Sequence, residues 1–244
     1  EEHLANTLHT AQILGSPVAR CYLGSMDDRK GEGGIYRHIE ELVKVCKSVQ
    51  SRAMDAGVKI AIENHAGDMQ GWELAMLIEE AGKDYVGATM DCGNALWALE
   101  EAMVNLEHLG PYAVSTGMRD NAMWDSENGA MTAWTNIGDG QIDWNAYLER
   151  YQQLCPNTPF NLEIISGAIR EFPYFQSEFW ESYPKARASE FARFVAMAKK
   201  GKPFEHPADR PTGERSKELT QAQQKYDLEK SLQYCKEKLG LGLK

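Results

Sequence analysis

The sequence lacks the features that mark membrane and disulfide-rich proteins. No run approaches the roughly 20 apolar residues that cross a bilayer, and the first residues lack the basic, apolar and small-residue order of a signal peptide. The five cysteines lie far apart and form no CxxC pair, which argues against a zinc knuckle or a disulfide framework. We therefore expect reduced thiols, a cytoplasmic location and no membrane partner.

Basic charge is also scarce. The chain of 244 residues has 26 Lys and Arg against 36 Asp and Glu, a formal net charge of −10. A nucleic-acid partner requires a basic surface that neutralises phosphates, so we expect no nucleic-acid partner. The phosphate-binding patterns GxGxxG and GxxxxGK[ST] are missing as well, which removes the usual signs of a nucleotide-binding sheet.

Short apolar segments alternate with longer segments of helical periodicity. The expected strands cover 18–24, 58–63, 86–90, 113–118 and 160–165, and the expected helices cover 3–14, 35–56, 71–81, 99–109 and 144–154. A longer loop rich in Gly, Asp and Trp is expected over 119–143. Strands that alternate with helices are typical of a parallel sheet built from βα units, so the sequence predicts an α/β fold.

Polar residues gather where the predicted strands end. Four of the predicted strands carry a polar residue at or just beyond the carboxyl end, or within the strand. These residues are Glu63, Asp91, Arg119 with Asp120, and Glu163. Because four consecutive strands contribute, we favour a closed barrel, whose strand ends face one mouth, over an open doubly wound sheet. Arg20 lies one strand earlier, and the sequence leaves open which way it points.

Three of these residues are carboxylates in apolar surroundings. Glu63 follows the apolar run Ile60-Ala61-Ile62, and Glu163 interrupts another apolar run. A buried charge is costly unless it is paired or metal-bound, although a helix cap or a loop salt bridge also explains Glu63, and Asp91 is a common turn residue. Three carboxylates that converge would form an oxygen-rich site suited to Mg²⁺ or Mn²⁺.

The segments IAIENH, TMDCGNALW, MRD and NLEIISG, in this order and spacing, resemble the sugar phosphate isomerase/epimerase family, which has a xylose isomerase-like (β/α)8 TIM barrel. The resemblance covers roughly 11–201. It implies a divalent metal held by Glu63, Asp91 and Glu163. The family's fourth ligand is a His, and this chain has Gly117 at that position. Loss of a nitrogen ligand favours Mn²⁺ or Mg²⁺ over Zn²⁺ and weakens binding.

The resemblance also implies a reaction on a small sugar or sugar derivative. Its enzymes move a proton next to a carbonyl through an enediolate, and Glu63 and Glu163 are the expected catalytic pair. The expected substrate-binding residues are His65, Asn94, Arg119 and Trp124, with Trp97 and Trp134 near the same loops. His65 is an alternative metal ligand, and a surface salt bridge is the alternative for Arg119.

Several functions remain compatible with this pattern. The leading one is a sugar isomerase or epimerase, and a lyase or dehydratase that acts on a keto-sugar uses the same enolisation step. A carbohydrate-binding barrel without catalytic activity is a second possibility, with Gly117 as the trace of lost turnover. Metal-dependent phosphodiester cleavage is disfavoured by the net charge of −10 and by the small number of histidines near the site.

Two domains are expected. Residues 1–202 would form a partial barrel, because only five strands are predicted and the chain opens at Glu1 within a predicted helix. We expect the first βα units to be missing from this chain, or a partner chain to compensate for them. Residues 203–244 would form an extended arm and a helix near 216–239, whose apolar face packs on the barrel or on another subunit of a homo-oligomer. That face comprises Leu228, Leu232, Tyr234 or Cys235, and Leu239.

Overall fold

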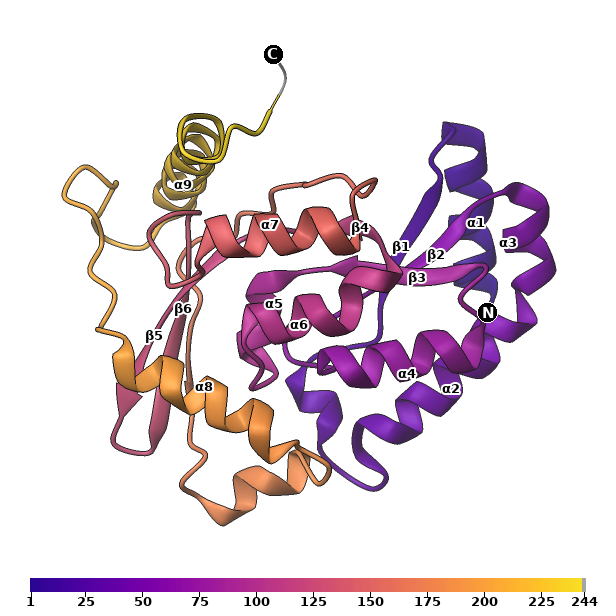
Figure 1. The fold of residues 1–244 in the computed structure, drawn as a ribbon, viewed down its shortest axis with the longest axis horizontal. Coiled ribbons are helices and arrows are strands. Elements are labelled where there is room, and N and C mark those ends of the chain that lie inside the picture. Colours follow the sequence, from indigo (N-terminus) through magenta and orange to yellow (C-terminus); the bar gives the residue numbers. More distant parts are fainter. Residues whose placement is uncertain (243–244) are drawn as a thin grey trace.

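Four short strands form a parallel sheet in the computed structural model, which describes residues 1–242 (Figure 1). Neighbouring strands in the sheet are also neighbours in the sequence, in the order β1-β2-β3-β4. Their bounds are β1 (Val18–Tyr22), β2 (Lys59–Glu63), β3 (Val86–Met90) and β4 (Ala113–Thr116). The first four predicted strands are therefore confirmed, and their carboxyl ends point the same way because every pairing in this sheet is parallel.

Helices follow these strands as a βα pattern requires. They are α1 (Glu2–Leu14), α2 (Gly34–Ser48), α3 (Gln50–Ala56), α4 (Gly71–Ala81), α5 (Cys92–Trp97), α6 (Ala102–Leu109) and α7 (Trp144–Leu154), with 3-10 helices at Met26–Arg29, Gly110–Tyr112 and Ser177–Ser182. Two predictions need correction. The single helix expected over 35–56 is interrupted at Val49, and the helix expected over 99–109 starts only at Ala102, because Leu99 has a positive φ of 61° that no right-handed helix allows.

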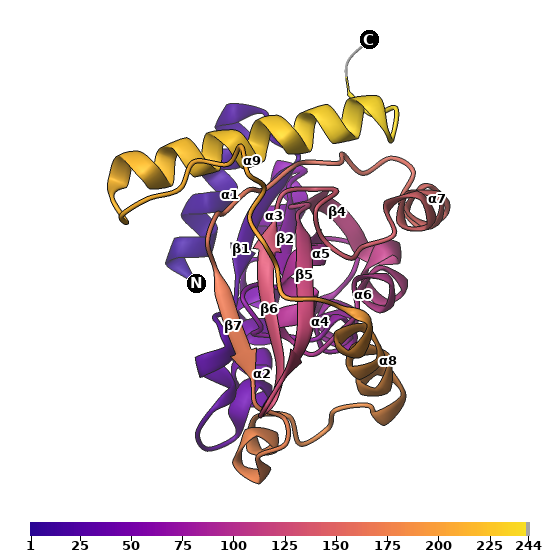
Figure 2. The same ribbon diagram turned by 90° about the vertical axis from the view of Figure 1, so that its left-hand side faces the viewer.

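The loop predicted over 119–143 is wrong, because most of it is a β-hairpin. Strands β5 (Asp120–Ser126) and β6 (Gly129–Thr135) pair antiparallel, and β7 (Ile169–Phe172) joins them in a second sheet. This sheet contacts α5 and α8 (Ala188–Lys200), and Figure 2 shows its strands side by side. The loop between the two strands is Glu127-Asn128, and Gly129, which has a φ of 155°, begins β6.

The predicted strand over 160–165 is also wrong. Only one bridge, between Met118 and Leu162, is present there. Met118 N–H donates to the Asn161 carbonyl at 2.7 Å, and Glu163 N–H donates to the Met118 carbonyl at 3.0 Å. Residues 161–163 therefore pair with Met118, which lies just beyond β4. This pairing holds Glu163 beside the end of β4.

The carboxyl-terminal segment has an arm and a long helix. Residues 201–216 contain no helix or strand, and α9 (Lys217–Glu237) crosses the top of the view in Figure 2. The predicted apolar face is wrong for Leu228 and Leu232, which are 40% and 53% exposed. The buried residues of α9 are Asp227, Ser231 and Cys235. A polar contact determines this orientation, since Arg210 of the arm donates to Asp227 at 3.0 and 3.1 Å.

The two faces of the parallel sheet differ in character. Ala19, Ile60 and Ile62 lie on one face and belong to the main apolar core. Successive strand residues point to opposite faces, so Arg20 and Glu63 lie on the other face, together with Thr89 of β3. This second face, at its carboxyl end, is where the predicted site residues meet.

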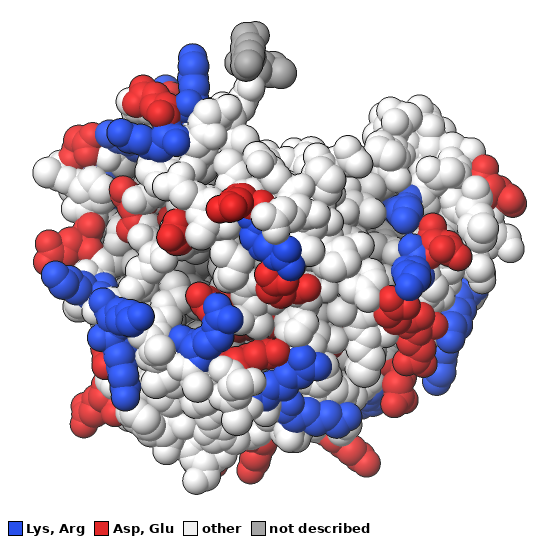
Figure 3. All heavy atoms as spheres, in the orientation of Figure 1, with Lys and Arg blue, Asp and Glu red and all other residues white. Residues whose placement is uncertain are grey.

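On the face drawn in Figure 3, Lys and Arg side chains are interspersed with Asp and Glu. This pattern provides no basic patch on that face for a phosphate backbone. Among residues 1–242, none of the helices has the length and apolar character of a membrane span.

Candidate active site

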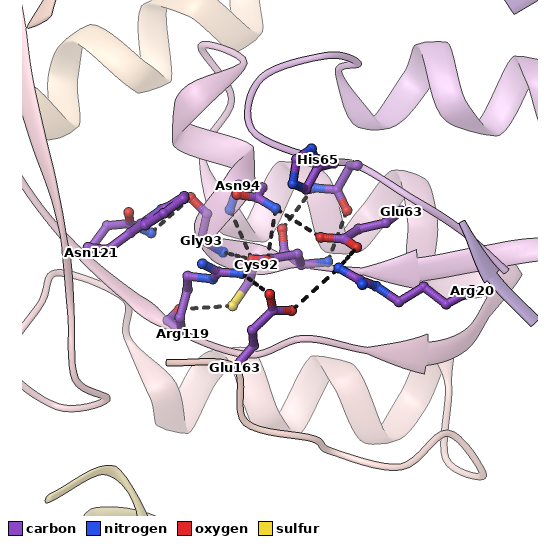
Figure 4. A network of polar contacts seen from close by, with 12 residues as sticks. Arg20, Glu63, His65, Cys92, Gly93, Asn94, Arg119, Asn121 and Glu163 are labelled. Carbon is purple, nitrogen blue, oxygen red and sulfur yellow. Dashed lines mark hydrogen bonds and ion pairs between the residues drawn. The ribbon is translucent and has the colours of Figure 1, made fainter. Parts of the chain in front are cut away.

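Three carboxylates converge at the carboxyl ends of the parallel strands. One oxygen each of Glu63, Asp91 and Glu163 lies within 4.8 Å of the others, and we call this group the carboxylate cage (Figure 4). Glu63 is the last residue of β2, Asp91 directly follows β3, and Glu163 is held beside the end of β4. The side chains of Glu63 and Asp91 are fully buried, whereas that of Glu163 is 32% exposed. The expected convergence of these three residues is thus present.

Asp91 has two structural tasks. Its Oδ1 accepts hydrogen bonds from the backbone N–H groups of Gly93 at 2.8 Å and Asn94 at 3.0 Å, which caps the amino terminus of α5. Its Oδ2 faces the cage and accepts from Arg119 Nη2 at 2.5 Å. The two oxygens are therefore divided between the cap of α5 and the cage.

Two arginines form ion pairs with the cage. Arg119 Nη2 also lies 2.9 Å from Glu163 Oε1, and its guanidinium stacks on the Trp134 ring at 4.4 Å. Arg20 of β1 forms an ion pair with Glu63 and lies 3.9 Å from Glu163 Oε2. Arg119 is buried and not a surface residue, while Arg20, which the sequence could not orient, joins the site because it shares a sheet face with Glu63.

Asn94 lies between two members of the cage. Its Nδ2 donates to Asp91 Oδ2 at 2.9 Å and to Glu63 Oε1 at 3.2 Å. Its Oδ1 is buried and has no hydrogen-bond partner among the described residues. A buried amide oxygen without a partner is unfavourable, so this position is suited to an additional donor or cation.

His65 lies beside the cage and not in it. Its ring stacks on Tyr22 with 4.1 Å between ring centroids, and its Nδ1 lies 2.7 Å from the carbonyl oxygen of Gly24. A carbonyl only accepts hydrogen bonds, so Nδ1 carries the proton and Nε2 is left as an acceptor. His65 is not in the group whose ligand atoms lie within 4.8 Å of one another.

Gly117 leaves room for Glu163. A Cβ atom at position 117 would lie 2.5 Å from Glu163 Oε2, closer than atoms can approach. The place where the sequence predicted a missing imidazole is therefore occupied by the Glu163 carboxylate. This carboxylate reaches both arginines from there.

Trp124 is the one predicted site residue that the fold does not bring to the cage. In the hairpin, Asn121 pairs with Trp134 and its Nδ2 donates to the Gly93 carbonyl at 3.2 Å, so these residues mark the side that faces the cage. Trp124 is three positions further along β5 and therefore lies on the opposite face. Trp134, from the same group of tryptophans, is the ring that reaches the site.

Burial raises the pKa of two cage carboxylates, Glu63 and Asp91. Burial, reinforced by the nearby Asp91 carboxylate, raises the pKa of Glu63 to about 7, although Arg20 opposes the change. Burial also raises the pKa of Asp91, against the opposing charge of Arg119. Glu63 is thus able to gain or lose a proton near neutral pH, as a general acid or base must.

Comparisons with known proteins identify the family of the fold. The family model described as xylose isomerase-like TIM barrel matches residues 2–170. No curated protein gave a significant match. Similar solved structures include a xylose isomerase domain protein from Planctomyces limnophilus (18% identity, 67% of this chain and 58% of that chain, TM-score 0.53).

Two further structures are similar. One is a xylose isomerase-like TIM barrel protein from Mycobacterium smegmatis in complex with magnesium (11% identity, 82% of this chain and 66% of that chain, TM-score 0.55). The other is an L-ribulose 3-epimerase (14% identity, 96% of this chain and 69% of that chain, TM-score 0.51). The chain spans less than two thirds of the length of the Planctomyces and Mycobacterium proteins. Since the family model covers more than half of it, the chain belongs to the xylose isomerase-like TIM barrel family.

Proposed function

We propose that the protein is a metal-dependent enzyme of the sugar isomerase/epimerase type, which moves a proton next to the carbonyl of a sugar or sugar derivative. The observation that carries the proposal is the convergence of Glu63, Asp91 and Glu163 within 4.8 Å at the strand ends. Similar structures named for an L-ribulose 3-epimerase and for a magnesium complex support it. A lyase or dehydratase would use the same first proton transfer.

The residues present fit a divalent cation. Carboxylate and amide oxygens are the donors that Mg²⁺ and Mn²⁺ prefer, and the unpartnered Asn94 Oδ1 adds a neutral oxygen next to the three carboxylates. Gly117 contributes no imidazole, which supports Mn²⁺ or Mg²⁺ over Zn²⁺. A bound cation would stabilise the negative charge that develops on the substrate oxygens.

The protein's own groups would move the proton. Glu63 is buried at the end of β2 as part of the cage, and it is the group that would accept a proton from carbon and return it. Glu163 is partly exposed and lies on the other side of Arg20 from Glu63. From there it would act on the face of a substrate opposite to the one that Glu63 contacts. His65 Nε2 and Asn94 would receive or donate hydrogen bonds to sugar hydroxyls.

Isotope exchange tests this proposal. Protein loaded with Mn²⁺ is incubated in D2O with a panel of ketopentoses and ketohexoses. We expect deuterium at the carbon beside the carbonyl of at least one sugar. The rate of this exchange should fall by about 100-fold or more in Glu63→Gln. Glu79→Gln, on the surface, is the matched control and should keep the wild-type rate. Sugar binding without Mn²⁺ binding or exchange would instead identify a carbohydrate-binding barrel.

A further inference from the structure

Each arginine of the site touches two carboxylates. Arg119 Nη2 lies 2.5 Å from Asp91 Oδ2 and 2.9 Å from Glu163 Oε1. Arg20 Nη2 contacts Glu63 Oε2 and lies 3.9 Å from Glu163 Oε2. The two nitrogens therefore lie against the same oxygens that a divalent cation would need, as the dashed lines of Figure 4 show.

These ion pairs offset much of the charge of the cage carboxylates. Three carboxylates within 4.8 Å of one another repel, and two of them are fully buried. A buried charge persists only when it is paired. Arg20 and Arg119 supply two positive charges against three negative ones, so most of the repulsion is already removed.

The three carboxylates differ in their freedom to move. Asp91 is fixed by its cap of α5, and Glu63 is fully buried at the end of β2. Glu163 is 32% exposed, lies over Gly117, and is the carboxylate that both arginines share. Arg20 is 44% exposed, so its guanidinium can turn to solvent, whereas Arg119 is only 2% exposed and rests on Trp134.

We propose that Arg20 and Arg119 are positioning residues that hold the carboxylate cage together in the absence of a cation, and that a divalent cation enters by exchange with them. Arg20 leaves Glu63 and turns to solvent, and Arg119 keeps Asp91 while Glu163 rotates from the arginines to the cation. This inference rests on the proposed function, because it requires that the cage binds a cation. The arginines then lower the cation affinity of the wild-type protein.

Calorimetric titration of metal-free protein with MnCl2 tests the exchange. We expect Arg20→Met to bind Mn²⁺ about tenfold more tightly than the wild type, because the cation no longer competes with a charge in contact with Glu63. Arg20→Lys, which keeps a charge that can pair with Glu63, should stay close to the wild type. Arg52→Met removes a charge from an exposed position on α3 and is the matched control. Circular dichroism verifies that each variant is folded.

A second measurement separates displacement from simple charge repulsion. Arg20→Ala leaves a space next to Glu63 that methylguanidinium can fill from solvent. We expect methylguanidinium to weaken Mn²⁺ binding competitively in Arg20→Ala and to leave the wild type and Arg52→Met unchanged. Tight Mn²⁺ binding by Arg20→Ala without this competition would overturn the exchange.

The outcomes also separate this inference from the proposed function. If the wild type binds Mn²⁺ and Arg20→Met binds it no more tightly, the exchange is wrong and the metal site stands. If neither the wild type nor Arg20→Met binds Mn²⁺, the exchange and the proposed metal-dependent function are both wrong. Binding by Arg20→Met alone would support the exchange directly.

Discussion

At the scale of a single residue, Glu63 links burial to pH. Its side chain ends β2 and is fully buried between Arg20 and Asp91, and burial raises its pKa to about 7 from an ordinary 4.5. The folded protein therefore holds this proton more tightly than the unfolded chain does. Between these two pKa values, raising the pH removes the proton from the unfolded chain first and lowers the free energy of unfolding.

Chemical denaturation of metal-free protein checks this linkage. The wild type should lose stability relative to Glu63→Gln as the pH rises from about 5 to about 8, by on the order of 3 kcal/mol, with little further change above that range. Glu79→Gln is the control. The pKa of Glu79 lies below its usual value because Tyr112 and Lys83 donate to it, so both its folded and unfolded states are ionised throughout. If the free energy of unfolding changed with pH in the same way in the wild type and in Glu63→Gln, the raised pKa of Glu63 would be contradicted.

At the scale of secondary-structure elements, α9 is held by polar contacts. Asp227 accepts from Arg210 at 3.0 and 3.1 Å and also from Ser166, while Ser231 accepts from the backbone of Ile137 at 3.0 Å. Leu228 and Leu232 remain exposed. The predicted apolar face is therefore wrong at Leu228 and Leu232, although Cys235 of that face is buried in the core. Periodicity cannot reveal a buried ion pair with a residue 17 positions away.

Replacement of Asp227 should loosen this helix. Asp227→Ala leaves the Arg210 guanidinium buried and unpaired, and we expect a loss of about 3 kcal/mol in the free energy of unfolding. The double variant Arg210→Met, Asp227→Leu should recover part of that loss, because no charge is then left unpaired. Leu232→Ser, on the exposed face, should change stability by no more than about 0.5 kcal/mol. Equal losses in Leu232→Ser and Asp227→Ala would show that the apolar face is the one in contact.

At the scale of the whole molecule, two sheets meet at the site. Strand β4 (Ala113–Thr116) is the last strand of the parallel sheet, and the chain then passes through residues 117–119 into Asp120, the first residue of β5. The buried Asp120 carboxylate accepts from Trp144 Nε1 at 2.7 Å and from the backbone of Gly138 at 3.0 Å and Asn121 at 2.8 Å. It thereby joins the hairpin to α7 in the main core.

Asp120→Ala should weaken this junction. The N–H groups of Trp144 and Gly138 would lose their acceptor in a buried setting, and we expect a loss of about 2 to 4 kcal/mol. Asp120→Asn keeps one acceptor oxygen and should lose less. Urea denaturation measures the free energy of unfolding of both variants. A smaller loss of stability in Asp120→Ala than in Asp120→Asn would show that the carboxylate does not join the hairpin to α7.

The sequence predicted the local features better than the distant ones. Strands β1 to β4 and the place of Glu63 and Asp91 at strand ends follow from apolar runs, which are local properties. Glu163 instead reaches the cage through an isolated bridge beside β4. The hairpin of 120–135 and the single bridge at 160–165 depend on which other segment of the chain each one pairs with, and a local pattern does not contain this information. Arg20 was unassigned for the same reason, because its direction becomes fixed only through the register of β1 with β2.

The aromatic stack behind the cage gives the protein an optical reporter. Trp134 lies under Arg119 and stacks on Trp97 with 4.4 Å between ring centroids. Two indoles this close couple their electronic transitions, and the nearby guanidinium charge shifts the energy of the Trp134 excited state. Intrinsic fluorescence and near-ultraviolet circular dichroism therefore sense the position of Arg119 without any attached label.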